Sequence, residues 1–469
     1  MRNILILFCQ FFLFNNVIAN VVPNSLFSDH MVLQEGVPVP IWGTADKDEK
    51  VTVIFNDQRV STITGEDGKW FIKLSSFPYI LKPSSMVITG KDTVIIKDIM
   101  VGEVWLCSGQ SNMERQLGQR PPQPLIYHWE EERDAAKYPL IREYYVPLKY
   151  AKQKVDDVNS KWTVCSPKTV SDFSAVGYFF ARDLFKQLKV PVGIIFSAYG
   201  GTPAEDWTSK IALESNPKLR ELVKNYNSVI SEHWHPSGEL ISGLYNGMIY
   251  PLIPYSIKGV VWYQGEQNNF RPKQYRTILA NMIKNWRRDF KQGEFPFLIV
   301  QIAPYKEMSP ELRESQFWVT QTTKNTALIV TTDCGDANNI HPSHKQPVGY
   351  RLSLAARALA YNENIEYSGP VFDSYKIKNN KIILSFKHVG KGLSTKYNAP
   401  LKGFTIASDD KKFISATAVI KRNHIVVYGD NIQKPTAARY GWSNVPDGNL
   451  YNSQMLPASP FRTDTAYFK

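Results

Sequence analysis

Short runs in which apolar and polar residues alternate follow one another between residues 20 and 99. Alternation with a period of two is typical of half-buried strands, and turn residues such as Glu66-Asp67-Gly68 separate the runs. No run with a helical period occurs there. The pattern therefore predicts a β-sandwich domain over residues 20–99, with strands at 37–43, 49–55, 68–74 and 86–90.

Between residues 100 and 366, runs typical of buried strands alternate with helical patterns. In residues 171–188, for example, Phe173, Val176 and Phe180 share one helical face. Such alternation predicts a parallel sheet that is covered by helices on both faces. The predicted strands are 103–109, 192–198, 258–264, 295–303 and 326–333, and the predicted helices are 171–188, 309–321, 347–361 and one that carries Tyr275 to Phe290.

The two ends of the chain differ from this central region. After residue 366 the strand patterns return, at 381–388, 401–408, 416–421 and 424–429, so residues 367–469 are predicted to be β-rich. At the other end, Arg2 precedes an apolar run at 4–14, and a small-residue cleavage site ends at Ala19. We therefore predict a signal peptide over residues 1–19 and a secreted or periplasmic protein; a membrane anchor is the alternative. No later run approaches 18 apolar residues, so no membrane span is expected.

Composition narrows the choice of partners. The formal net charge is +12, but the lysines and arginines are scattered and no run of five occurs, so we predict no nucleic-acid partner. Beyond Cys9 the chain has only Cys107, Cys165 and Cys334, and this odd number leaves at least one thiol unpaired. The sequence permits one disulfide and does not identify it.

Chemically distinctive residues follow four of the predicted strands. They are Ser111 after the first strand, Gly200 and Gly201 after the second, Gln264 and Asn268 after the third, and Asp333, Asp336 and His341 after the last. Ligands of an open parallel sheet bind beyond the carboxyl ends of its strands, so these residues are expected to share one site.

Together these residues supply what acyl transfer requires. A serine needs a neighbouring imidazole to take its proton, which assigns Ser111 as nucleophile and His341 as base. A tetrahedral intermediate needs fixed donors, and Gly200 and Gly201 can present backbone N–H groups without a side chain in the way. The side-chain amide of Gln264 or Asn268 would add another donor. Met113 replaces the last glycine of a G-x-S-x-G motif, which argues against an ordinary α/β-hydrolase.

Three alternatives use other residues. The pairs His341/His344 and His233/His235 have the spacing of metal ligands, but they lack a positioned glutamate, so we predict no metal. Glu205 and Glu266 resemble the carboxylate pair of a glycoside hydrolase. A non-catalytic carbohydrate-binding protein on the scaffold of an inactive esterase would have lost its nucleophile or base, but Ser111 and His341 are both present. Trp207, Trp234 and Trp442 could stack on sugar rings.

Several segments resemble the sequence blocks of the sialate O-acetylesterase family, within the SGNH hydrolase class. These segments are GEVWLCSGQSNME (102–114), SAYGGTPAEDW (197–207), LYNGMIYPL (244–252), VVWYQGEQNN (260–269) and IHPSHKQPVGYRLSLAARAL (340–359), and the stretch from 439 to 464 resembles the family's carboxyl terminus. The resemblance implies a flavodoxin-like, three-layer αβα catalytic domain over residues 100–366, flanked by β-sandwich segments. It also implies hydrolysis of O-acetyl esters on sialic acid without a cofactor; acetylated plant glycans such as xylan or pectin are the alternative substrates.

The resemblance assigns Ser111 and His341 as nucleophile and base. The Ser111 N–H, the Gly200-Gly201 loop and Gln264 would form the oxyanion hole, with Asn268 as a further donor. The chain departs from the family pattern before the histidine, where asparagines occupy positions 338 and 339. Asp336 is our first choice for the triad acid and Asp333 the second, and a Ser-His dyad is the alternative.

Overall fold

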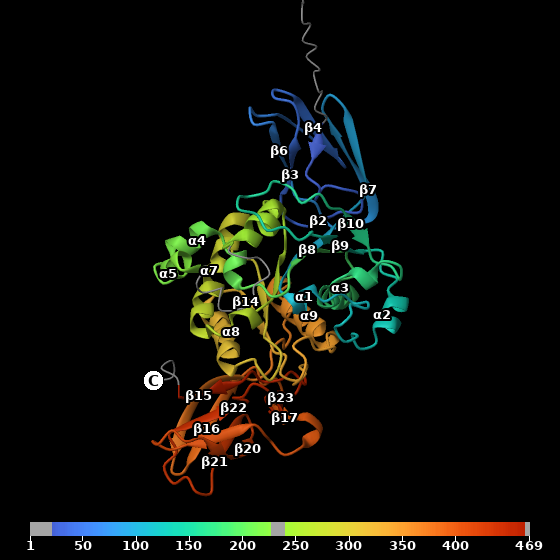
Figure 1. Cartoon of the computed structure of the whole chain (residues 1–469). Helices are drawn as coiled ribbons and strands as arrows, with labels where there is room; N and C mark the ends of the chain where they lie inside the picture. Colours follow the sequence, from blue (N-terminus) through green and yellow to red (C-terminus); the bar gives the residue numbers. More distant parts are fainter. Residues whose placement is uncertain (1–20, 227–239, 465–469) are drawn as a thin grey trace, which may run out of the picture.

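A single long strand joins the amino-terminal region to the centre of the molecule. The computed structural model describes residues 21–226 and 240–464, and Figure 1 shows them as an α/β region between two β-rich regions. Strand β8 (Thr93–Gly109) begins antiparallel to β7 (Ile80–Thr89) and ends between two parallel partners in the central sheet. The predicted division at residue 99 therefore falls inside one continuous strand, which changes partners instead of ending in a turn.

The amino-terminal region contains every strand that alternation predicted there. In β6, Trp70, Ile72 and Leu74 enter the core while the residues between them are exposed. One sheet has the order β1-β3-β6, and β4, β5 and β7 continue the sheet of β8, with which β2 also pairs. The strands are β1 (Val22–Pro23), β2 (Val32–Gln34), β3 (Val39–Thr44), β4 (Lys50–Phe55), β5 (Gln58–Ile63) and β6 (Lys69–Leu74).

The central sheet has the order β10-β9-β11-β8-β12-β13-β14. Only β10 is antiparallel to its neighbour, so the predicted parallel sheet is confirmed. Taken in chain order, β8, β11, β12, β13 and β14 have the spatial order 2-1-3-4-5, which reverses direction at β8. The bounds are β9 (Ile141–Tyr145), β10 (Trp162–Val164), β11 (Val192–Ala198), β12 (Gly259–Tyr263), β13 (Phe297–Val300) and β14 (Thr326–Ile329). Polar residues in β9 and β10 hid these two strands from the sequence analysis.

Helices cover both faces of the central sheet. Helices α3 (Ala175–Leu188) and α9 (Gln346–Ala360) share one apolar core with Val261 of β12. Helices α7 (Pro272–Phe290) and α8 (Pro310–Thr322) share the opposite core with the neighbouring Trp262. Helix α3 begins later than predicted because the Ser174 hydroxyl caps it, accepting the Gly177 N–H at 3.1 Å. The short helices are α1 (Ser111–Glu114), α2 (Trp129–Ala135), α4 (Lys210–Ser215) and α5 (Arg220–Lys224).

The carboxyl-terminal region encloses a core of its own between two four-stranded sheets. Ile382 and Val427 enter this core from one sheet, and Phe404 and Tyr440 enter it from the other. The sheets have the orders β15-β16-β21-β20 and β19-β18-β22-β24, and β17 pairs with β23 beside them. The strands are β15 (Val371–Lys378), β16 (Lys381–Lys387), β17 (Leu393–Thr395), β18 (Phe404–Ala407), β19 (Ile414–Ser415), β20 (Thr417–Lys421), β21 (His424–Tyr428), β22 (Ala437–Tyr440), β23 (Leu450–Asn452) and β24 (Phe461–Arg462).

Two further expectations concern cysteines and membranes. Cys107, Cys165 and Cys334 are all buried free thiols, so the one disulfide that the sequence permitted is not formed among them. Within residues 21–226 and 240–464, no helix is long and apolar enough to cross a membrane. The predicted signal peptide lies outside the described residues.

Candidate active site

Ser111 lies where β8 ends, as the first residue of α1. The chain reaches it through Gly109, which has a φ of 140° and would place any Cβ atom 2.1 Å from the carbonyl oxygen of Tyr263. Only glycine permits this approach. The Gln110 N–H then donates to the Tyr263 oxygen at 3.0 Å, which ties the start of α1 to β12. Ser111 is therefore half-buried at the carboxyl edge of the sheet.

The loop after β11 packs directly against Ser111. A Cβ atom on Gly200 would lie 3.1 Å from the Cβ atom of Ser111. The Gly200 N–H already has an acceptor, because it donates to Glu114 Oε2 at 2.7 Å, and Arg120 pairs with the other carboxylate oxygen at 2.6 Å. By contrast, no hydrogen bond from the Ser111 or Gly201 N–H group reaches any residue that the structure describes. These two N–H groups therefore have no acceptor among the described residues and are free to bind a substrate oxygen.

The two side-chain amides predicted as oxyanion donors are bonded to each other. Gln264 donates to Asn268 Oδ1 at 2.7 Å and to the Thr202 carbonyl at 3.1 Å. The Asn268 oxygen also accepts the Ala204 N–H at 2.9 Å, which fixes the orientation of its amide. Both protons of the Gln264 amide are therefore used within the protein. Gln264 and Asn268 are fully buried and tie the loop after β12 to the loop after β11.

Asn268 extends this network to a buried ion pair. It donates to Glu205 Oε2 at 2.9 Å, and the other oxygen of that carboxylate pairs with Arg271. Glu205 is 0% exposed, and this ion pair satisfies its charge. Because Glu205 is buried and both of its oxygens have partners, it has a structural role here. A glycosidase carboxylate needs a position that is open to the substrate.

Asn112 joins the loop of Ser111 to the loop of His341. Its amide donates to the Ile340 carbonyl at 3.0 Å and to Glu266 Oε1 at 2.8 Å, while its oxygen accepts from Lys345. Asn112 and Lys345 escaped the sequence analysis. Their proximity to Ser111 and His341 along the chain was the available signal, but nothing in the sequence indicated that they would meet.

His341 is half-buried, and its surroundings favour the neutral imidazole. Burial lowers the pKa of His341 to about 4, with further lowering by the positive charges of Lys345, Arg120 and Arg115. The backbone N–H of His341 donates to Asn339 Oδ1 at 2.8 Å. Its ring makes no hydrogen bond to Ser111 or to any other residue in the described ranges. Such bonds are often long or misaligned in an enzyme without substrate.

Neither candidate triad acid forms a hydrogen bond or ion pair with His341 in this structure. The carboxylate of Asp336 accepts the Asn338 N–H at 2.8 Å on an exposed loop. Asp333 forms a two-pronged ion pair with Arg351, with both distances 2.7 Å, and this pairing helps to lower the pKa of Asp333 against the effect of burial. The structure therefore brings the loop of Ser111 and the Gly200-Gly201 loop together, and no described carboxylate is hydrogen-bonded to His341.

The residues of the alternative functions have other environments. His344 lies beside Tyr127, with a ring separation of 5.7 Å, and His233, Trp234 and His235 lie outside the described residues. No three His, Cys, Asp or Glu side chains of the described ranges form a group that could hold a metal ion. Trp207 is buried and donates to Thr202 Oγ1 at 2.9 Å, so it presents no free face to a sugar. Trp442 packs beneath Arg462 at 4.8 Å.

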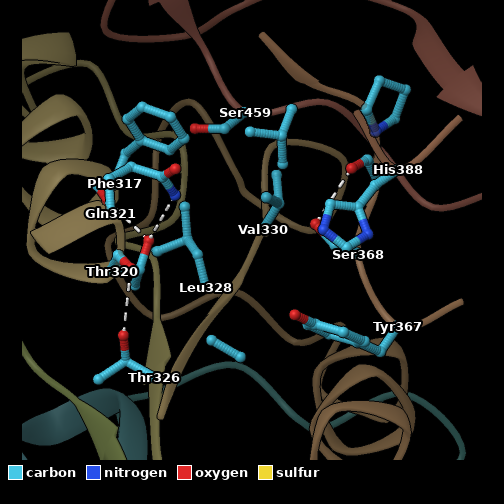
Figure 2. A pocket seen from close by; sticks show the side chains of 14 residues that line it. Phe317, Thr320, Gln321, Thr326, Leu328, Val330, Tyr367, Ser368, His388 and Ser459 are labelled. Atoms are coloured by element: carbon cyan, nitrogen blue, oxygen red, sulfur yellow. Dashed lines mark hydrogen bonds between the residues drawn. The ribbon is translucent and has the colours of Figure 1, made fainter. Parts of the chain in front are cut away.

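A separate pocket lies at the β14 edge of the sheet, three strands from β8. Figure 2 shows hydroxyl side chains such as Thr320 and Ser459 around it, with Tyr367 and His388 on the opposite wall. The cavity measures about 220 Å³. His388 is paired with Glu366 at 2.7 Å, and Thr320 donates to the Phe317 carbonyl at 2.7 Å. This pocket contains none of the predicted catalytic residues.

Comparisons with known proteins point to carbohydrate esterases. Residues 101–359 match the family described as carbohydrate esterase, sialic acid-specific acetylesterase. The sialate O-acetylesterases of Pongo abelii and Homo sapiens are each 30% identical to the chain over 488 aligned positions, which cover 93% of this chain and 91% of theirs. The crystal structure of a carbohydrate acetylesterase from Xanthomonas citri is 35% identical, with a TM-score of 0.86, and covers 95% of this chain and 100% of that one.

Proposed function

Because the chain belongs to the sialic acid-specific acetylesterase family of carbohydrate esterases, we propose that it removes O-acetyl groups from carbohydrate through an acyl-enzyme on Ser111. The observation that carries this mechanism is the position of Ser111. It begins α1 at the carboxyl end of β8, in contact with Gly200 and one residue before the asparagine that is bonded to the His341 loop.

In the first half of the proposed reaction, the Ser111 hydroxyl attacks the acetyl carbonyl and His341 takes its proton. The tetrahedral intermediate then collapses, and the imidazolium returns the proton to the departing sugar oxygen. In the second half, His341 takes a proton from water, which attacks the acetyl-serine. The second tetrahedral intermediate collapses, acetate leaves, and the imidazolium returns the proton to the Ser111 oxygen, which restores the free enzyme. The lowered pKa of His341 supports the role of base, because the ring is neutral and able to accept a proton down to about pH 4.

The oxyanion that forms in each half needs donors. The N–H groups of Ser111 and Gly201 are the best candidates, because neither donates to another described residue. Gly200, Gln264 and Asn268 were predicted as donors as well. Their bonds to Glu114, Thr202 and Glu205 support a positioning role, in which they hold the donor loop rather than meet the oxyanion. Each remains a candidate donor if substrate displaces those bonds.

The orientation of His341 separates two versions of the mechanism. Asp336 as the triad acid stays a prediction, and it would require the exposed loop to bring the carboxylate to the ring. The contacts of Asp336 with Asn338 and of Asp333 with Arg351 favour a Ser111–His341 dyad. In that version burial, and not a carboxylate partner, holds the neutral imidazole of His341 in its orientation.

The proposal also covers the substrate, the location of the enzyme and its domain organisation. We infer O-acetylated sialic acid as substrate, because the mammalian relatives are named as sialate O-acetylesterases; acetylated plant glycans are the alternative, since the bacterial structure is named only as a carbohydrate acetylesterase. We also infer cleavage near Ala19 and a secreted or periplasmic location. The proposed organisation is an SGNH-type catalytic domain over 100–366 between a β-sandwich domain over 20–99 and a β-rich segment over 367–469.

A substrate screen tests this proposal. Purified enzyme is incubated separately with O-acetylated sialic acids, acetylated xylan oligosaccharides and acetylated pectin fragments, and mass spectrometry follows the loss of acetyl groups. The Ser111→Ala variant serves as the matched control for spontaneous deacetylation. We expect the highest kcat/KM on sialic acid esters. Faster deacetylation of a plant glycan would move the assignment to that substrate, and no deacetylation of any carbohydrate would refute the proposed function.

A further inference from the structure

A fully buried lysine contacts the residue next to the proposed nucleophile. Lys345 lies four residues after His341 and is 1% exposed. Its ammonium donates to Asn112 Oδ1 at 2.5 Å and lies 5.3 Å from the ring centre of Tyr263. Burial of an ammonium group is costly unless hydrogen bonds and an opposite charge compensate for it. A buried lysine beside the catalytic loops therefore calls for a physical explanation, and the mechanism above makes no use of it.

The opposite charge lies on the other side of Asn112. Glu266 Oε1 accepts the Asn112 amide at 2.8 Å, and Glu266 Oε2 has no hydrogen-bond partner in the described part of the chain. The asparagine thus stands between an ammonium at its oxygen and a carboxylate at its amide. Its second amide proton goes to the Ile340 carbonyl, beside His341. All the polar atoms of this side chain are used, so its orientation is fixed.

Burial and the neighbouring charges shift the pKa values of Lys345 and Glu266. Burial lowers the pKa of Lys345 to about 7; Glu266 raises it, Arg115 lowers it further, and Cys334 raises it. Burial also raises the pKa of Glu266, which the bond from Asn112 and the charges of Lys345 and Arg313 oppose. Lys345 is in turn the first of the cations that lower the pKa of His341, ahead of Arg120 and Arg115. The Lys345 ammonium therefore affects both proposed catalytic residues. It binds Asn112, the neighbour of Ser111, and its charge lowers the pKa of His341.

We propose that Lys345 is a positioning residue for the esterase reaction, which holds Asn112 between itself and Glu266 and so fixes Ser111 relative to the His341 loop. This inference rests on the proposed function of Ser111 and His341. Besides positioning Asn112, Lys345 has an electrostatic effect on His341. The ammonium keeps the imidazole neutral and able to accept the proton of Ser111 at acid pH.

Three variants test the assignment. Lys345→Met keeps most of the length of the unbranched side chain but removes the charge and the donor. Glu266→Gln keeps an acceptor for Asn112 and removes the partner charge, and the third variant combines both changes. Lys258→Met is the matched control. Lys258 directly precedes β12, whereas Glu266 follows the other end of that strand. The Lys258 ammonium also lies near a buried carboxylate, that of Glu103, at 3.7 Å. Circular dichroism and thermal unfolding establish that each variant is folded.

Lys345→Met is expected to lower kcat on an aryl acetate by about 10²-fold with little change in KM, because a small displacement of reacting groups costs that much. The acid limb of kcat/KM should also move to higher pH, since the lost positive charge no longer lowers the pKa of His341. Glu266→Gln should lower kcat by about tenfold. The double variant should be no slower than Lys345→Met, because it leaves no unpaired buried charge. Lys258→Met should match wild type in both readouts.

Two outcomes overturn the assignment: a folded Lys345→Met enzyme with kcat within about threefold of wild type, or an unchanged acid limb. If Lys345→Met does not fold, Glu266→Gln decides, and a kcat within about twofold of wild type refutes the assignment. Ser111→Ala separates this inference from the proposed function. If Ser111→Ala is inactive while Lys345→Met behaves as wild type, only the role of Lys345 fails; if Ser111→Ala is active, the serine mechanism itself fails.

Discussion

The two halves of the candidate site are held in very different ways. The half built from the loops after β8, β11 and β12 is locked, since Gln264 bonds to Asn268 and Thr202 and the Gln110 side chain accepts the N–H groups of Gly265 and Gln267. The half that carries His341 follows β14 through an exposed loop, and the imidazole has no hydrogen bond to any described residue. Only Asn112 and Lys345 join the two halves among the contacts above. The proposed nucleophile and donors are thus positioned before substrate arrives, whereas the proposed base is placed mainly by burial and charge.

The largest effect should come from the less constrained half. His341→Ala removes the only base proposed for Ser111, so kcat on an aryl acetate should fall by a factor on the order of 10⁴, as in other serine hydrolases that lose a member of the catalytic unit. Steady-state kinetics measures the loss. A variant that keeps more than a tenth of wild-type kcat would show that another group serves as base.

The locked half should respond in stability as well as in rate. Gln264→Ala removes two buried hydrogen bonds that hold the donor loop, so we expect displacement of that loop to lower kcat by about 10²-fold and the free energy of unfolding to fall by about 1–3 kcal/mol. Kinetics together with urea denaturation measures both. The same loss of kcat with unchanged stability would instead identify Gln264 as a direct oxyanion donor, as its position after β12 first suggested.

The acid limb of the pH profile reports the charge environment of the base. The pKa of His341 is lowered to about 4, so the neutral base persists below the ordinary histidine range. The value of kcat/KM should therefore be nearly level from pH 7 to pH 5 and fall as the pH decreases through about 4. A limb near pH 6.5 would mean that the cations around the ring do not act on it as the geometry implies.

The smallest effect should come from the two aspartates. Neither Asp336 nor Asp333 is hydrogen-bonded to His341, so Asp336→Asn and Asp333→Asn should each keep kcat within about threefold of wild type, a margin of only ~0.6 kcal/mol. Asp333→Asn should still lower the melting temperature, since it breaks the ion pair with Arg351. A loss of about 10⁴-fold in Asp336→Asn would establish a triad and refute the dyad.

The sequence predicted the architecture better than the contacts within the site. Periodicity sufficed for α7 and α9, whose apolar faces are long, and for β6, whose alternation is regular. It missed β9, because a strand with the sequence IREYY shows no apolar alternation and becomes buried only through its neighbours. Strand ends correctly placed Ser111 beside Gly200, since parallel strands bring their carboxyl ends to one edge.

Side-chain partners could not be read from the sequence in the same way. The bond from Gly200 to Glu114, and the meeting of Asn112, Glu266 and Lys345, depend on rotamers and loop paths that no periodicity encodes. The predicted acid shows the same limit. Asp336 is close to His341 in the chain, but the turn in which it accepts the Asn338 N–H gives the carboxylate another partner.

Covalent labelling of Ser111 tests the central claim most directly. A fluorophosphonate reacts with a serine that an adjacent base activates and an oxyanion hole serves, and it leaves a stable adduct. After stoichiometric loss of esterase activity, peptide mass spectrometry should find the adduct on Ser111, and the His341→Ala variant should label far more slowly. An enzyme that loses activity with the adduct on a different residue, or one that stays active with Ser111 fully labelled, would contradict the acyl-enzyme mechanism.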